Sequence, residues 1–161
     1  MTSAAHAHSH VPGHDHDACI SDALGKAEAH CADTGAKLTP IRRQVLELIW
    51  QSHKPVGAYD LLAQLGKGGQ KIAPPTVYRA LDFLIEQGLV HRVESLNAFI
   101  GCTEPGHPRQ QEIFICRSCG TAQEINDPGL GQRIHEDARA LGFRVERQTI
   151  EAVGLCSACA A

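Results

Sequence analysis

Two Cys-x-x-Cys pairs constrain the fold of this chain more than any other feature of its sequence. They are Cys116 with Cys119 and Cys156 with Cys159. Each pair can form a turn that points two thiolates the same way, and two such turns complete a closed, structural four-thiolate zinc site. This site would tie the last predicted strand to the first. The C-terminal unit that contains both pairs has only ~50 residues, too few to be held together by an apolar core alone.

The alternative interpretations of these pairs are a redox dithiol or unrelated thiols. A redox pair sits at a helix N-terminus that lowers its thiol pKa, and neither pair is placed that way. Seven cysteines and ten histidines occur in a chain without an apolar signal core, and in that context cysteine pairs bind metal more often than they form disulfides. No apolar run approaches the ~18 residues of a membrane span, so we expect a cytoplasmic protein without a membrane partner.

Catalysis is not expected. A four-thiolate zinc site has no open position for a substrate, and no nucleophile–base pair is evident in the sequence. We therefore predict neither enzymatic activity nor a small organic substrate.

The stretch from 74 to 102, PPTVYRALDFLIEQGLVHRVESLNAFIGC, predicts a helix followed by a two-stranded ribbon. Pro75 suits a first helical turn, and Val77, Leu81 and Leu84 follow helical spacing up to Gly88. Beyond the glycine, LVHRVES and NAFIGC have the pattern of a hairpin. A helix over 75–87 with a ribbon behind it is the winged form of the helix-turn-helix.

Helices are also predicted over 18–33, from Pro40 through the apolar stripe that ends at Ile49, and over 58–65; the second has Thr39 as its N-cap and Pro40 at its first position. Residues 37–92 carry eight Lys or Arg against four acids, although the whole chain has a net charge of −3. This central segment alone has the positive balance needed to approach phosphates. The helix over 75–87 would take the recognition position in a major groove.

Six residues are candidates for DNA contact. Arg79 is the candidate for base recognition, because its guanidinium can donate twice to guanine at ~1–3 kcal/mol of discrimination. Tyr59 would contact a phosphate or a thymine methyl group, or else be a half-buried core tyrosine. Contacts to phosphates, which position the protein without specifying sequence, are assigned to Arg42, Arg43, Lys71 and Thr76.

The remaining chain divides into a tail, a hinge and a C-terminal unit. Residues 1–17 have no apolar periodicity and five histidines, which indicates a disordered tail that is either a weak metal scavenger or simply solvated. We assign 18–101 to the winged-helix domain, 102–110 to a hinge and 111–161 to a small α/β unit. In that unit we expect short strands on both sides of the first Cys pair, a long strand over 143–156, and a helix with Leu130, Ile134, Ala138 and Leu141 inward.

A second metal site is suggested by His91, Cys102, His107 and Glu124. One thiolate, two imidazoles and one carboxylate suit Zn²⁺. Taken singly, these residues could equally be an exposed wing histidine, a buried thiol, a solvated loop histidine and a surface acid.

Several motifs together resemble the ferric uptake regulator family, and within it the zinc uptake regulators. They are PPTVYRALDFLIEQGLVHRVES, the opening Leu38-Thr39-Pro40 with Arg42, the run Ala58-Tyr59-Asp60-Leu61-Leu62, and the two Cys pairs, in that family's order. The resemblance implies an α+β fold with an N-terminal winged-helix DNA-binding domain and a C-terminal α/β dimerisation domain. It matches the four cysteines to structural zinc, the set His91, Cys102, His107 and Glu124 to a regulatory zinc, and Tyr59 and Arg79 to operator contacts.

The function implied is that of a homodimeric, zinc-responsive repressor of zinc-uptake genes, with two Zn²⁺ per chain and a pseudo-palindromic DNA operator. The chain lacks the HHxH-type stretch of iron-sensing members near 104–110, which argues against an iron sensor. The alternatives are a sensor of iron, manganese or peroxide with the same fold, and a zinc-storage or metallochaperone protein.

Overall fold

The structure is a computed structural model that describes residues 16–160 apart from 53, 70, 107–109 and 126. The prediction for the tail, residues 1–17, therefore lies almost wholly outside the described part. Two compact units are present, one within 11–107 and the other within 108–161. Each unit is described by itself.

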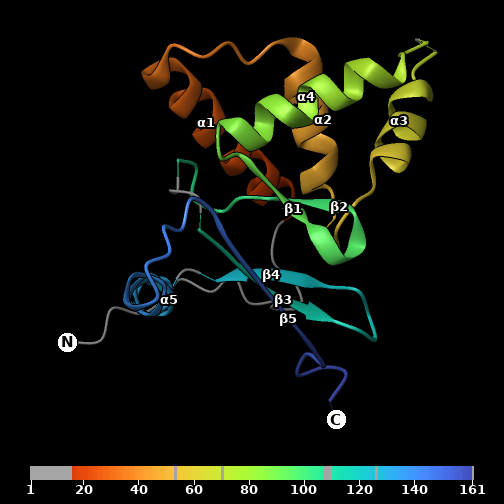
Figure 1. Cartoon of the computed structure of the whole chain (residues 1–161). Coiled ribbons are helices and arrows are strands. Elements are labelled where there is room, and N and C mark those ends of the chain that lie inside the picture. Colours follow the sequence, from red (N-terminus) through yellow and green to blue (C-terminus); the bar gives the residue numbers. More distant parts are fainter. Residues whose placement is uncertain (1–15, 53, 70, 107–109, 126, 161) are drawn as a thin grey trace. The chain divides into compact units, whose positions relative to one another are not determined.

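The first unit is four helices followed by a ribbon (Figure 1). The helices are α1 (His16–Thr34), α2 (Pro40–Trp50), α3 (Ala58–Gly66) and α4 (Pro74–Glu86). The ribbon strands β1 (Val90–Val93) and β2 (Ala98–Gly101) are antiparallel and joined by a short 3-10 turn, η1 (Glu94–Leu96). Asn97, which ends this turn, is left-handed with φ 47°. Asparagine tolerates that conformation better than most residues.

One apolar core holds these helices and the ribbon together. Along α4, Val77, Ala80, Leu81 and Leu84 are buried, which is the i, i+3, i+4, i+7 spacing of one helical face. Gly88, at φ 64°, then turns the chain out of the helix and into β1. The helix predicted over 75–87 is thus present, starting one residue earlier at Pro74 and ending one earlier at Glu86.

Helix α2 begins as predicted at Pro40, with Thr39 in the N-cap position. The Thr39 side chain makes no capping hydrogen bond. Its carbonyl instead accepts from the Arg43 N–H at 2.9 Å, the first bond of the helix. The proline, which needs no acceptor for its nitrogen, therefore sets the start of this helix more than the threonine hydroxyl does.

The second unit is a three-stranded sheet with one helix (Figure 1). Its elements are β3 (Gln110–Cys116), β4 (Ala122–Ile125), α5 (Pro128–Ala140) and β5 (Gln148–Gly154). The sheet order is β4-β3-β5, with β3 antiparallel to β4 and parallel to β5. Because α5 connects antiparallel β4 to a strand on the far side of β3, the first and last strands of the unit become neighbours.

Two sequence expectations for this unit were wrong. The long strand over 143–156 is shorter, because β5 begins only at Gln148. Leu130 and Leu141 do not point inward: they are 37% and 85% exposed, and Gly131 is the buried residue of α5. The covered side of α5 includes Gly131 with the half-buried Ile134 and Ala138, and the two leucines fall outside it.

No helix among the described residues combines the length and the apolar character needed to cross a membrane.

Candidate metal centres and nucleic-acid interface

The four cysteines of the two Cys-x-x-Cys pairs lie together at one edge of the second unit. Parallel strands β3 and β5 run in register up to the pair Cys116 and Gly154, so both end at that edge. A similar turn follows each: the Cys116 carbonyl accepts from the Gly120 N–H, and the Cys156 carbonyl from the Ala160 N–H, both at 2.9 Å. The strand register therefore brings together pairs that lie far apart in the sequence.

The sulfur geometry fits a tetrahedral metal ion. All four Sγ atoms lie within 4.8 Å of one another, and those of Cys119 and Cys156 are 3.8 Å apart. Zinc–sulfur bonds of about 2.3 Å in a tetrahedron require sulfur separations of about 3.8 Å. The four cysteines can thus hold Zn²⁺ as a closed site with no position left for a substrate.

Local hydrogen bonds favour the thiolate at two of the four cysteines, Cys116 and Cys119. Backbone N–H groups of Cys119 and Cys156 lower the pKa of Cys116 to about 6, the latter donating at 3.4 Å. The Thr121 hydroxyl, with its Oγ1 3.3 Å from the sulfur, lowers the pKa of Cys119. Because zinc binds the thiolate and not the thiol, these contacts reduce the free energy needed to deprotonate Cys116 and Cys119. At Cys159 the Ser118 hydroxyl lowers the pKa, but the neighbouring thiols of Cys156 and Cys119 outweigh it and raise the pKa to about 11.

A second group of potential ligands lies on the ribbon of the first unit. His91 is on β1 opposite Ile100 of β2, and Cys102 follows β2 directly, its N–H donating to the Leu89 carbonyl at 3.0 Å. A ring nitrogen of His91 and the Cys102 Sγ lie within 4.8 Å of each other. Both side chains are buried, with 4% and 3% exposed. An imidazole and a thiol this close can share one metal ion.

The other two predicted ligands, Glu124 and His107, are not on the ribbon strands. Glu124 lies on β4 of the second unit, opposite Ile113, and is half-buried. His107 lies outside the described residues.

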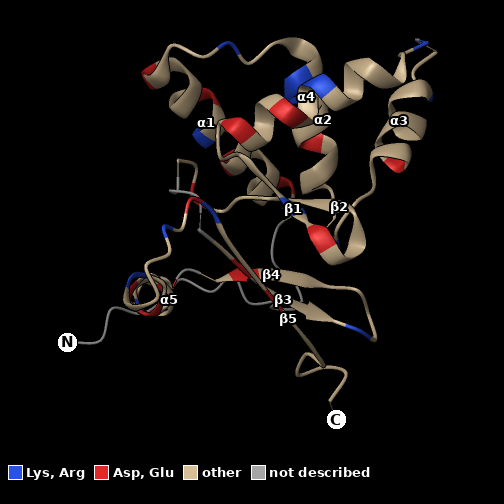
Figure 2. Cartoon of the chain, viewed as in Figure 1, with Lys and Arg blue, Asp and Glu red and all other residues tan. Residues whose placement is uncertain are grey.

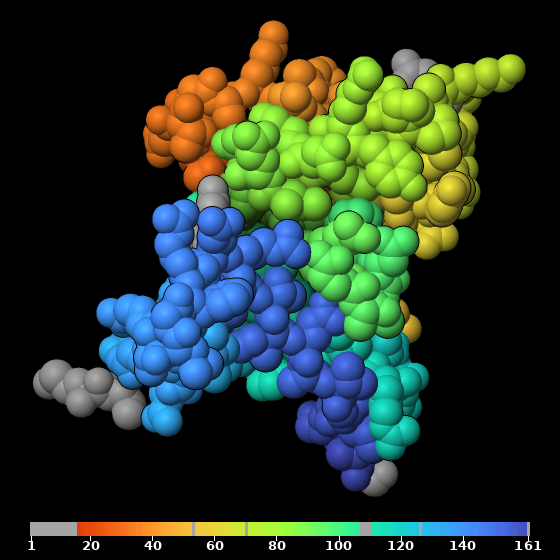
Figure 3. Space-filling model, viewed as in Figure 1, coloured from red at the N-terminus to blue at the C-terminus, as the bar shows by residue number. Residues whose placement is uncertain are grey.

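The candidate DNA-binding residues lie on the helices of the first unit. Tyr59, on the first turn of α3, is 79% exposed, and not a half-buried core tyrosine. Thr76 and Arg79 are exposed on α4, and Lys71 is exposed in the loop before it. In the space-filling view the surface of α4 (yellow-green) adjoins that of α3 (yellow) (Figure 3).

Tyr78 also belongs to the exposed face of α4, with 44% of it accessible, and the sequence analysis missed it. It falls between Val77 and Ala80, which are both buried. Its neighbours in the sequence suggested no role, but helical geometry places it beside Arg79 on the exposed side. A tyrosine directly before the candidate Arg79 was the sequence feature that could have indicated it.

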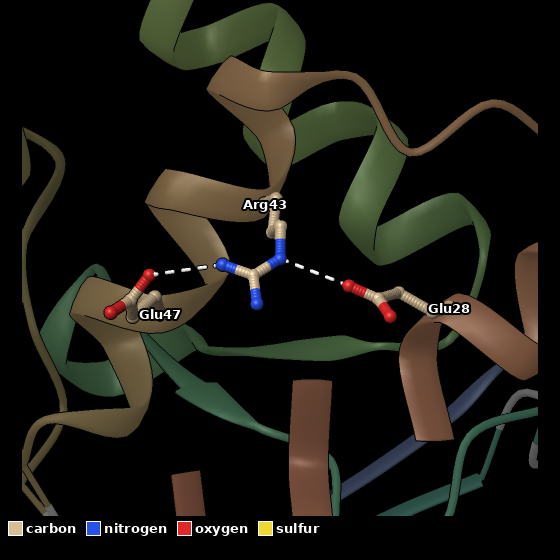
Figure 4. Close-up of polar contacts among 3 residues, drawn as sticks. All are labelled: Glu28, Arg43 and Glu47. Carbon is tan, nitrogen blue, oxygen red and sulfur yellow. Dashed lines mark hydrogen bonds and ion pairs between the residues drawn. The ribbon is translucent and has the colours of Figure 1, made fainter. Parts of the chain in front are cut away.

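Two predicted phosphate contacts, Arg42 and Arg43, already make contacts with other residues of the first unit. The Arg42 guanidinium lies 3.6 Å from the centroid of the Phe83 ring and donates to the Lys37 carbonyl at 2.6 Å. Arg43 pairs with Glu28 of α1 at 2.9 Å and with Glu47 of α2 at 3.4 Å (Figure 4). For either arginine to reach a phosphate, these contacts have to be exchanged.

Charge on the first unit is mixed. Lys and Arg (blue) lie on α2 and α4, with Asp and Glu (red) on the same helices (Figure 2). The positive balance found in the sequence of 37–92 is therefore partly neutralised at Arg43. Arg79 and Lys71 are among the cations of this segment that remain exposed.

Comparison with known proteins agrees with this architecture. The pattern of the Ferric uptake regulator family matches residues 33–153. The zinc uptake regulation protein of Escherichia coli (strain K12) is 43% identical over 139 residues, which cover 84% of this chain and 80% of that protein. The ferric uptake regulation protein of the same strain is 29% identical over 126 residues, covering 76% and 83%.

A solved structure of a zinc uptake regulator complexed with zinc and DNA has 42% sequence identity and a TM-score of 0.82, covering 88% of this chain and 95% of that one. The α+β fold class predicted from the sequence is confirmed. The relatives are named as regulators, in agreement with the prediction that the chain is not an enzyme. This chain belongs to the ferric uptake regulator family.

Proposed function

We propose that this chain is a zinc-responsive transcriptional repressor that acts in the cytoplasm. As a zinc-loaded homodimer it binds pseudo-palindromic operator DNA of zinc-uptake genes. The observation that carries the proposal is the closeness of His91 and Cys102 on the wing of a winged helix. Support comes from the similarity to a zinc uptake regulator solved with zinc and DNA.

Each chain holds two zinc ions in this proposal. The first is structural, on Cys116, Cys119, Cys156 and Cys159. The second is regulatory, on His91 and Cys102 with Glu124 and His107 completing the set. A thiolate beside imidazole favours zinc over manganese, because soft sulfur is a poor ligand for that harder ion.

Repression requires the regulatory zinc to bind the DNA-competent form more tightly than the incompetent one. Changing a 1:99 population into 99:1 requires about 5.5 kcal/mol of differential binding. By linkage, operator DNA must then tighten zinc binding by the same factor. Arg79 and Tyr59 serve to contact the operator, with Thr76 and Lys71 near them on or before α4.

The test is operator binding at two zinc levels, using a duplex selected from a random pool by the zinc-loaded protein. A mild chelator removes exchangeable zinc but leaves the four-thiolate zinc in place, which metal analysis verifies. We expect affinity to fall by about 5- to 150-fold on chelation. Equal affinity in both states would remove the sensing function.

Cys102→Ser is the matching variant. It should fold, dimerise and retain one zinc per chain, yet bind the operator equally weakly with and without added zinc. Cys19→Ser is the control, because Cys19 is a partly exposed cysteine of α1 outside both metal groups. It should respond to zinc like the wild type.

A further inference from the structure

The ribbon of the first unit has two unlike faces. Cross-strand partners share a face, and side chains alternate along each strand. By the register, Val90 and Gly101 lie on one face, with Phe99 two residues before the glycine. His91 and Ile100 lie on the other, the face to which Cys102 also belongs. The potential zinc ligands and the glycine are therefore on opposite sides of the same two strands.

Gly101 is covered by the only tryptophan of the chain. Trp50, the last residue of α2, packs on this glycine so tightly that a methyl group there would overlap the indole, 2.7 Å from Cζ2 and closer still to Cε2 and Nε1. No side chain fits at this position while the indole stays in place. Strand β2 and the end of α2 are thus in direct contact, next to Cys102.

A second connection joins β2 to the start of α3. Val56 and Phe99 form an isolated antiparallel bridge, in which the Val56 N–H donates to the Phe99 carbonyl at 3.0 Å and the Phe99 N–H to the Val56 carbonyl at 2.9 Å. Val56 precedes α3 by two residues. Strand β2 therefore holds both ends of the connection 51–57, one through Trp50 and the other through Val56.

We propose that Trp50 is a positioning residue that transmits zinc occupancy of the ribbon to helices α2 and α3. This inference rests on the proposed function. Zinc on His91 and Cys102 fixes one face of β2, the opposite face then fixes the indole, and the edge of β2 away from β1 fixes the Val56 bridge. The placement of α3, which carries Tyr59, follows from both.

The physical basis is that a two-stranded ribbon is marginally stable alone, so groups bound on its faces decide its position. A methyl-sized displacement of β2 cannot be absorbed at Gly101, because the indole already occupies the space. Close-packed contacts transmit small shifts in this way and do not damp them. Trp50 touches neither DNA nor zinc in this proposal.

Intrinsic fluorescence tests the first step. The chain has one tryptophan, so all indole emission reports on Trp50. Zinc is titrated into full-length protein that holds only the four-thiolate zinc. We expect emission to change and to saturate at one added zinc per chain, with no change in Cys102→Ser. Constant emission during a titration in which zinc demonstrably binds would overturn the proposal.

Three variants test the second step through the ratio of operator affinities with and without zinc. Gly101→Ala forces the indole away, and Trp50→Leu removes it. Each should reduce the ratio by about 2- to 30-fold. In the combined variant the methyl group has room, so the ratio should recover part of the loss and the effects should not add. Purely additive losses, or ratios equal to the wild type, would contradict the relay.

Leu48→Ala controls for loose packing, since Leu48 is another partly buried apolar residue of α2 packed on the same core. It should lower the thermal midpoint while keeping the zinc ratio. A loss of ratio here equal to that of Trp50→Leu would assign the effect to general destabilisation. If the wild type itself shows no zinc dependence, the proposed function fails first, whatever the variants do.

Discussion

The two proposed metal sites of this chain differ in how completely one unit builds them. All four thiols of the cysteine site come from the second unit, from the ends of two strands paired in register. Of the four proposed regulatory ligands, His91, Cys102 and His107 fall within the stretch 11–107 of the first unit, and only Glu124 belongs to the second. A site complete within one unit stabilises that unit, whereas a site completed by distant groups can report whether those groups have come together.

The largest expected effect separates the two centres most clearly. Cys116→Ser removes a ligand that is buried at the end of β3. Structural zinc supplies about 10–16 kcal/mol in small zinc domains, comparable to the whole stability of a typical protein at about 5–15 kcal/mol. We expect the second unit to unfold and the dimer to be lost, measured by metal content, thermal unfolding and light scattering. A stable, dimeric Cys116→Ser protein would show that the two centres do not differ in this way.

Glu124→Gln tests whether the ribbon site draws a ligand from the second unit. Losing the carboxylate should lower the affinity for the exchangeable zinc and reduce the zinc response of operator binding, within a range of about 5- to 150-fold. The four-thiolate zinc and the fold should remain. The matched control is Glu136→Gln on α5, an exposed acid that accepts a hydrogen bond from Gln132 at 2.8 Å. Equal zinc affinities for the two variants would mean that Glu124 is not a ligand.

Arg79→Ala asks whether base recognition is independent of both metals. It should relax specificity at one guanine, by about 1–3 kcal/mol, while metal content and zinc dependence stay unchanged. The measurement is binding to the selected operator and to single-base variants of it. A uniform loss across all sequences would instead identify Arg79 as a phosphate contact.

Glu28→Gln should have the smallest effect. Releasing Arg43 from this partner makes its guanidinium available to a phosphate, at the loss of an exposed ion pair worth about 0–1 kcal/mol. We expect a slightly higher affinity for all duplexes and a steeper dependence on salt, by about one counterion, with unchanged zinc response. An unchanged salt slope would mean that Arg43 does not contact DNA.

Local patterns carried most of what the sequence predicted correctly. Helix α4 follows from the spacing of Val77, Leu81 and Leu84, and the grouping of the four cysteines from two short motifs. Both depend on residues close in sequence, whose geometry a helix or a tight turn determines alone. The pairing of β3 with β5 agrees with the expectation that a shared zinc site ties the last strand back to the first.

Features that depend on tertiary packing were missed. The inward prediction for Leu130 and Leu141 assumed that apolar spacing identifies the buried face, but Leu130 is exposed beside the buried Gly131 and Leu141 lies beyond the end of α5. The contact of Trp50 with Gly101 joins residues that are far apart in the sequence, and it leaves no periodic pattern in the sequence that would predict it. The ion pair of Arg43 with Glu28 depends on how α1 lies beside α2. The composition of either helix does not determine that arrangement.

The parallel pairing of β3 with β5 has a consequence for synthesis of the chain. The partner of Gln110 is Gln148, and every other β5 pairing follows it. At about 5–20 residues per second, a ribosome needs roughly 2–8 s to make the intervening stretch, during which β3 has only β4 beside it. The helices of the first unit precede β3 entirely, so the nascent chain can complete its DNA-contacting half while the central strand of the other half still exposes an unpaired edge.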